Sequence, residues 1–220
     1  MPTVAVDLPD RHVPGESGHQ RMARLKSPTD MIGLRTIAVL LCVLISSCAA
    51  PAKLPDTDGA VHSPLSGSNG DLVAIVFSST DCPIANAMAP DIQRASSETH
   101  ALGGRFYLIH ARRDLTAQAV KKHAKEYALT MPILVDRNHD LVEALGATVT
   151  PEALVLRFND DDRYEILYRG TVNNLYSSVG NRRKEISEHH LRDAVRIAAS
   201  GGVITVPRRD LFGCYIERTQ

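Results

Sequence analysis

The sequence predicts an α/β domain in which a central mixed β-sheet is flanked by helices on both faces. An unbroken apolar run, Leu72–Phe77, is rich in β-branched residues and too short for a helix, which is typical of a strand buried on both faces. Helix and strand patterns alternate after it, and this order indicates parallel strands joined by helices. Two strand patterns within residues 153–168, separated by a short acidic turn, then indicate an antiparallel hairpin.

The first helix is expected to follow the polar turn Ser78–Asp81, which ends the buried strand. Pro83 suits the first position of a helix, because the N–H that proline lacks would have no partner there. Apolar residues then recur at helical spacing within residues 84–102. Cys82 is therefore expected to lie at the N-terminus of this helix.

The remaining elements follow from hydrophobic period and from turn residues. In chain order we expect a strand at 105–110, a helix at 116–129 with Thr116 as its N-cap, a strand at 132–135, a helix at 138–145 that stops at Gly146, strands at 153–158 and 164–168, and a helix around 186–200.

The position of Cys82 gives it a chemical interpretation. Free backbone N–H groups and the positive end of the helix dipole stabilise a thiolate over a thiol. The sequence therefore predicts a cysteine with a lowered pKa and a nucleophilic sulfur atom.

Composition argues against several other functions. The 25 basic and 25 acidic side chains balance, and tryptophan is absent, so neither charge nor stacking aromatic residues favour nucleic acid binding. The four cysteines, Cys42, Cys48, Cys82 and Cys214, do not follow zinc or iron–sulfur spacings, and we predict neither a metal site nor another cofactor.

The N-terminal region has the pattern of an exported protein. Residues 1–30 are polar and lack periodicity, which indicates a disordered stretch or an extension upstream of the real start. Residues 31–48 combine a basic residue, a short apolar core and two small residues before Cys48, as in a signal peptide with a lipobox. An ordinary secretory signal or an uncleaved anchor is the alternative.

This pattern predicts a lipid on Cys48 and a location on the bacterial cell envelope, facing the periplasm. Residues 49–70 are rich in Pro, Ser, Gly and Asp and are expected to form a flexible tether for a domain spanning 71–220. Removal of the signal and lipidation of Cys48 would leave two free thiols, Cys82 and Cys214, in a compartment where disulfides persist.

Several short motifs together resemble the thioredoxin-like superfamily, and more narrowly a bacterial redoxin-type, peroxiredoxin-related branch. They are Asp81-Cys82-Pro83-Ile84-Ala85-Asn86 after a buried strand, Thr148-Val149-Thr150-Pro151-Glu152, and a closing Gly213-Cys214-Tyr215-Ile216. The resemblance implies a thioredoxin-like fold. It also implies a cis bond before Pro151, with Thr150 and Pro151 forming a substrate-binding wall opposite Cys82 and Pro83.

The chain also departs from the resembled families. A thioredoxin would carry a second cysteine where Ala85 stands, and a peroxiredoxin would carry a proline where Ile75 stands, although Ser79 fits the hydroxyl position of its motif. Cys214 is thus the candidate resolving thiol for Cys82, while a stable Cys82–Cys214 bridge or an inert thiol are the structural alternatives.

The leading hypothesis is an exported, membrane-tethered thiol–disulfide oxidoreductase that uses Cys82 as nucleophile and acts on protein thiols or disulfides of the cell envelope. A peroxiredoxin-like peroxidase is one alternative, which Ser79 favours. The other is a non-catalytic binding or metal-delivery module, which the absence of a cysteine at Ala85 favours.

Overall fold

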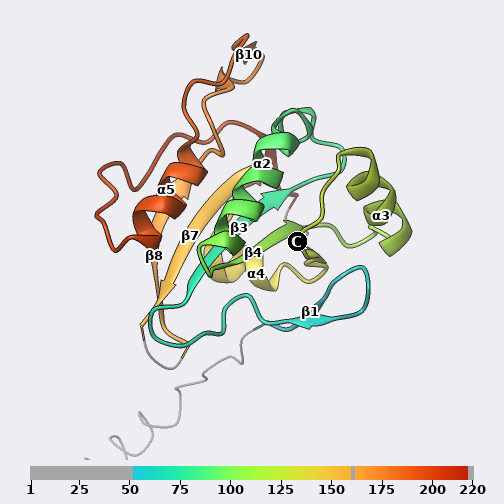
Figure 1. Ribbon diagram of the computed structural model, residues 1–220. Helices are drawn as coiled ribbons and strands as arrows, with labels where there is room; N and C mark the ends of the chain where they lie inside the picture. The colour runs from blue at the N-terminus through green and yellow to red at the C-terminus, as the bar shows by residue number, and fades with distance from the viewer. Residues whose placement is uncertain (1–51, 160–161, 218–220) are drawn as a thin grey trace, which may run out of the picture. The chain divides into compact units, whose positions relative to one another are not determined.

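A computed structural model describes residues 52–159 and 162–217, which belong to one compact unit, Ala50–Gln220 (Figure 1). Residues 1–51, which include the expected signal peptide, Cys42 and Cys48, lie outside the described part. Within that part, no helix is long and apolar enough to cross a membrane.

A five-stranded mixed sheet forms the centre of the fold, in the order β5-β4-β3-β7-β8. Its three parallel strands are β3 (Leu72–Ser78), β4 (Arg105–His110) and β5 (Ile133–Val135). β7 (Glu152–Phe158) runs antiparallel to β3, and β8 (Tyr164–Gly170) runs antiparallel to β7. The predicted order of elements and the predicted hairpin are confirmed.

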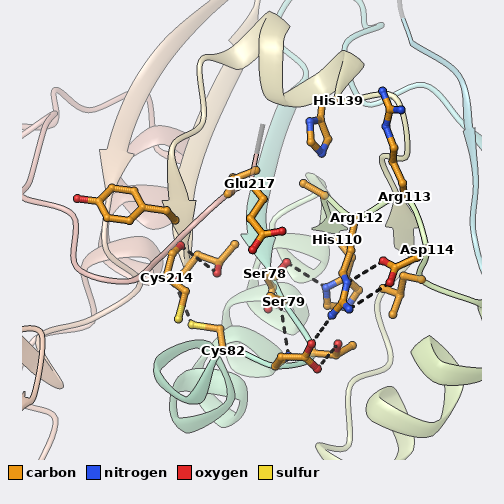
Figure 2. A pocket seen from close by; sticks show the side chains of 17 residues that line it. Ser78, Ser79, Cys82, His110, Arg112, Arg113, Asp114, His139, Cys214 and Glu217 are labelled. Atoms are coloured by element: carbon orange, nitrogen blue, oxygen red, sulfur yellow. Dashed lines mark hydrogen bonds and ion pairs between the residues drawn. The ribbon is translucent and has the colours of Figure 1, made fainter. Parts of the chain in front are cut away.

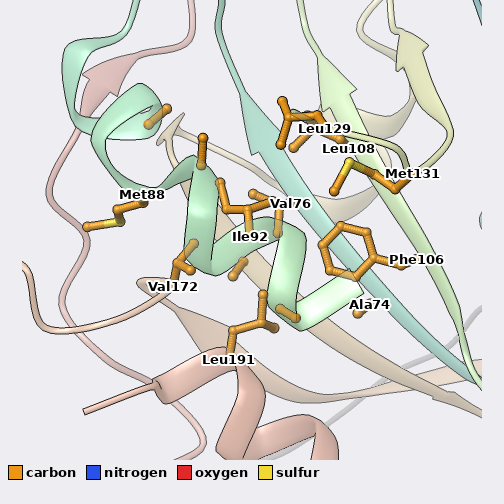
Figure 3. Packing of buried hydrophobic residues seen from close by; sticks show 14 of the residues in the cluster. Ala74, Val76, Met88, Ile92, Phe106, Leu108, Leu129, Met131, Val172 and Leu191 are labelled. Carbon is orange, nitrogen blue, oxygen red and sulfur yellow. The ribbon is translucent and has the colours of Figure 1, made fainter. Parts of the chain in front are cut away.

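Alternate residues of β3 enter two separate hydrophobic cores, as expected of a strand buried on both faces. Val76 packs in the core under α2 (Pro83–Ala101), α3 (Ala117–Glu126) and α5 (His190–Ala199). Figure 3 shows the Ile92 side chain of α2 pointing toward Val76 in this core. Ile75 and Phe77 pack in the other core with α4 (Asp140–Leu145). The predicted α/β thioredoxin-like fold, with helices on both faces, is confirmed.

The ends of the helices follow the sequence signals. Pro83 is the first residue of α2, and the Cys82 side chain caps it. The Thr116 hydroxyl accepts a hydrogen bond from Ala119 N at 3.2 Å and caps α3. Gly146 ends α4 in the left-handed conformation with φ 64°, which a glycine adopts without steric cost.

The described part of the expected tether differs from that expectation. Within residues 52–70, β1 (Leu54–Pro55) and β2 (Val61–His62) form an antiparallel hairpin. Asp56 forms a β-bridge with Leu134 at the edge of the sheet, and its Oδ2 is hydrogen-bonded to His62 Nε2 at 2.8 Å. These contacts hold the segment on the domain, although its proline and serine content is typical of a solvated linker.

Three further pieces of the fold carry no clear sequence signal. β9 (Tyr176–Ser178) and β10 (Asn181–Arg182) form a hairpin between β8 and α5, which Figure 1 shows projecting from the rest of the fold. β6 (Val149–Thr150) lies just before β7 in the chain. β11 (Cys214–Tyr215), near the C-terminus, pairs with β6 in antiparallel orientation. This last pairing forms one side of the site described next.

Candidate functional site

Cys82 lies where β3 leads into α2, as the sequence predicts. Its backbone is extended, with φ −84° and ψ 109°, and its N–H donates to Ser79 O at 3.3 Å. The sulfur atom accepts a hydrogen bond from Ala85 N at 3.5 Å, so the thiol itself satisfies a free N–H of the helix. The residue is only 1% exposed. The sulfur is therefore fixed at the start of the helix and is shielded from solvent.

The wall opposite Cys82 is formed by the Thr150–Pro151 peptide, which is cis. The Cys82 thiol donates a hydrogen bond to Thr150 O at 3.0 Å. The cis bond and the position of Thr150 and Pro151 across from Cys82 agree with what the resemblance implies. Whether this wall binds a substrate stays a prediction.

Cys214 reaches the same place from the far end of the chain. β11 pairs with β6 so that Cys214 lies opposite Thr150, and Ile216 N donates to Thr148 O at 3.0 Å. Both cysteines are free thiols, and their side chains are hydrogen-bonded to each other. Figure 2 shows the two sulfur atoms pointing toward one another. The structure thus brings Cys82 and Cys214 together, although Cys214 is exposed.

The two thiols differ in acidity. Burial disfavours the Cys82 thiolate, but hydrogen bonds from Cys214 and from Ala85 N outweigh it and lower the pKa of Cys82. Although the Cys214 residue is exposed, partial desolvation of its sulfur atom and the neighbouring Cys82 sulfur raise the pKa of Cys214 to about 11. When the pair loses one proton, the proton that remains therefore lies on Cys214, and the negative charge lies on Cys82.

We expect the pH dependence of alkylation of the reduced protein to distinguish the pKa of Cys82 from that of Cys214. The pH midpoint for modification of Cys82 should lie below the value of about 8.5 for a free cysteine, and that of Cys214 should lie above it. Peptide mapping of partly alkylated protein across a pH series measures both. In Cys82→Ser the midpoint of Cys214 should fall, because the charge that raises its pKa is gone. Midpoints in the reverse order would contradict the assignment.

A cavity of about 480 Å³ opens beside the cysteine pair. Its walls come from the loop after β3, the loop after β4, His139 and the C-terminal segment (Figure 2). Arg112 forms ion pairs with Asp81 and, at 2.8 Å, with Asp114, so the polar side of the cavity is a fixed charge cluster. The cavity therefore combines one wall of paired charges with the two cysteines.

His110 also lines this cavity. It is 1% exposed, its Nδ1 lies 3.0 Å from Ser78 O, and its Nε2 has no hydrogen-bond partner. Burial lowers the pKa of His110 to about 4, so the ring is neutral at physiological pH. His110 is the last residue of the strand predicted at 105–110, and this position is the sequence signal that could have identified it.

Glu152 supports the loop that carries Thr150 and Pro151, a role that was not predicted from the sequence. Its carboxylate is fully buried, accepts a hydrogen bond from Thr148 N at 2.8 Å and forms an ion pair with Arg169. These bonds hold the loop that carries Thr150 and Pro151. A carboxylate at the start of the apolar run Ala153–Leu156 is the signal that could have identified it.

Replacing Glu152 with alanine should destabilise the domain by about 3–5 kcal/mol, because it leaves the largely buried Arg169 charge without its partner. Urea denaturation measures this change. Glu165→Ala is the matched control, since Glu165 is exposed on β8 and should change stability by no more than about 0.5 kcal/mol. Equal effects of the two variants would show that Glu152 does not support the loop.

No group of three or more potential ligands that could hold a metal ion occurs among the described residues. The histidines near the site have other contacts instead. His123 Nε2 lies 2.8 Å from Asn86 Oδ1, and its ring packs edge-on against His110 with centroids 5.5 Å apart. The candidate site is therefore described by two thiols, a cis-proline wall and a charged cavity.

Comparisons with known proteins agree with the fold. A family model described as Redoxin matches residues 46–177, which is more than half of the chain. A hypothetical protein from Sinorhizobium meliloti 1021 is similar in structure, with TM-score 0.66 and 23% identity over 78% of this chain and 92% of that one. An uncharacterised conserved protein from Geobacillus kaustophilus also has TM-score 0.66, with 20% identity over 78% of this chain and 90% of that one. None of the curated proteins compared with the chain matches it.

Proposed function

Because this chain belongs to the Redoxin family, we propose that it is a thiol–disulfide oxidoreductase whose reacting groups are Cys82 and Cys214. The observation that supports this most strongly is the contact between two free thiols of unequal acidity beside a cis-proline. Two thiols in contact can pass between the dithiol and the disulfide form by thiol–disulfide exchange.

In the first step, the Cys82 thiolate attacks one sulfur of a partner disulfide. A bond forms between Cys82 Sγ and that sulfur, the partner S–S bond breaks, and the other partner sulfur leaves as a thiolate. The helix N-terminus and the Ala85 N–H favour Cys82 as the attacking group, because they stabilise its thiolate at neutral pH.

In the second step, Cys214 takes the place of the resolving cysteine that a Cys-x-x-Cys motif would carry at Ala85. Its thiolate attacks Cys82 Sγ, the mixed disulfide breaks, and the partner leaves as a second thiolate. Once Cys82 carries a mixed disulfide it holds no negative charge, so one cause of the raised pKa of Cys214 is removed. Cys214 thus becomes a better nucleophile at the stage where it must react.

The test supplies reduced protein with two oxidants in parallel, a disulfide-containing protein and hydrogen peroxide, and follows oxidation of the two cysteines by stopped-flow mixing and mass spectrometry. We expect rapid formation of the Cys82–Cys214 disulfide with the disulfide substrate. Faster oxidation by peroxide would favour the peroxidase alternative, which Ser79 beside the cavity supports. A pair that reacts with neither oxidant would favour a binding module.

The proposed location is the bacterial cell envelope, with the protein tethered through a lipid on Cys48. The support is the signal and lipobox pattern of residues 31–48. We expect wild-type protein in the membrane fraction, because two acyl chains each add about 0.8 kcal/mol of binding energy per buried CH₂ group. Cys48→Ala should give a released or unprocessed protein in cell fractionation, whereas a soluble, processed wild type would exclude the anchor.

A further inference from the structure

The C-terminal segment Gly213–Ile216 occupies the backbone edge beside the cis-proline as an added strand. β11 pairs with β6 in antiparallel register, Ile216 N donates to Thr148 O at 3.0 Å, and the Thr150 hydroxyl donates to Cys214 O at 3.4 Å. An extended segment from another polypeptide could form the same backbone bonds with β6 only if Gly213–Ile216 left this edge.

Each position of this segment meets a different requirement. A Cβ atom on Gly213 would lie 2.1 Å from Thr150 O, so only glycine permits the close approach. Cys214 directs its sulfur at Cys82, while Tyr215 is 85% exposed and has no restricting contact with the core. Ile216 is 9% exposed and packs into the core that contains Phe77. The edge therefore selects the pattern Gly-Cys-x-aliphatic.

The same segment also restricts access to Cys82. With β11 in place, Cys82 is 1% exposed and its sulfur contacts Cys214 and Thr150. A folded protein partner could not bring a sulfur atom into line with the Cys82 sulfur in this arrangement. Reaction with such a partner requires Gly213–Ile216 to leave β6 first.

We propose that Gly213–Ile216 is an internal occupant of a docking edge, and that the partner is a protein with an extended Gly-Cys-x-aliphatic segment that replaces it on β6. This inference rests on the proposed function, since the partner cysteine takes the position of Cys214 opposite Cys82. It adds the sequence pattern that the site recognises and a competition between the partner and the chain's own C-terminal strand.

The two steps of thiol–disulfide exchange match the displacement and the return of Gly213–Ile216. The partner's cysteine, present as one half of a disulfide, lies against Cys82 while Gly213–Ile216 is displaced; Cys82 attacks it and the partner's second sulfur leaves as a thiolate. When the segment returns, Cys214 attacks Cys82 Sγ, the mixed disulfide breaks, and the partner leaves as a thiol after taking up a proton. The Cys82–Cys214 disulfide then fixes the segment on the edge until a reductant of the thiol class opens it.

The test uses the full chain and a fluorescent synthetic peptide of residues 208–217 in which Cys214 is replaced by serine, so that no disulfide can form. Gly213→Val in the protein places a side chain against Thr150 O and releases the segment. We expect the peptide to bind this variant about tenfold or more tightly than it binds wild type, because the fraction of protein with a free edge rises. Tyr215→Ala is the matched control, and it should bind the peptide as wild type does.

A peptide that itself carries Gly213→Val should not bind any of these proteins. Ile216→Asp in the protein releases the segment from its other end and repeats the test if Gly213→Val does not fold, as judged by circular dichroism. Equal binding to released and wild-type proteins, or no binding to a folded released variant, would overturn the inference. Because the peptide has no thiol, this failure is distinct from failure of the proposed redox reaction, which oxidation of the cysteine pair measures separately.

Discussion

Replacing Cys214 with serine is expected to trap a mixed disulfide on Cys82. A serine hydroxyl can keep the β6–β11 pairing and a hydrogen bond to Cys82, but it cannot attack a disulfide. The structure places no other described cysteine near Cys82, since Cys214 is the only other free cysteine in that part of the chain. The adduct on Cys82 therefore has no internal route of release.

Incubation of reduced Cys214→Ser with glutathione disulfide should give about one glutathione per chain by intact mass, whereas wild type should end as the internal disulfide without an adduct. The Cys82→Ser/Cys214→Ser double variant is the control, and it should carry no glutathione in the domain. If wild type and Cys214→Ser accumulate the same adduct, Cys214 is not the resolving thiol, and the chain is better described as a monothiol protein.

Replacing Cys82 with serine should lower the rate of exchange with a disulfide substrate by a factor on the order of 10³ or more, because a nucleophile in covalent catalysis has no substitute. The remaining thiol, Cys214, is exposed, but desolvation of its sulfur, the largest cause of its raised pKa, persists without Cys82, so accessibility alone does not make it reactive. Stopped-flow measurement of disulfide reduction compares the rates.

A lower exchange rate of Cys82→Ser must be distinguished from loss of the fold in this variant. The Cys82 sulfur caps α2, and a serine hydroxyl is itself a favourable N-cap, so Cys82→Ser should retain the wild-type thermal midpoint within a few degrees. A folded Cys82→Ser protein that reacts at the wild-type rate would show that Cys214 is the entering nucleophile, and would reverse the two roles.

The sequence predicted the part of the site that depends on local signals. A β-branched apolar run, a polar turn and a proline at the first helical position together placed Cys82 at the start of α2. The cis bond before Pro151 came from family resemblance, since an X-Pro bond is cis in only about one case in twenty. These features depend on few residues that are close together in the chain.

The rest of the site depends on contacts between distant segments, which no local pattern reports. β11 has two residues and no hydrophobic alternation, so its pairing with β6 was not predicted. Gly213 is part of the closing motif, but nothing in the sequence indicates that close approach to Thr150 O requires a glycine there. The β1–β2 hairpin was missed for the same reason, because its strands are two residues long and lie in a proline-rich segment.

The proposed function requires Cys82 and Cys214 to form one reversible redox pair. The most direct measurement is peptide mapping by mass spectrometry of the folded protein after equilibration across a series of dithiothreitol redox buffers. We predict a single linked peptide pair joining Cys82 to Cys214, which disappears in one cooperative two-electron transition as the buffer becomes reducing. Cysteines that stay unlinked at the oxidising end of the series would show that Cys82 and Cys214 are not a redox pair.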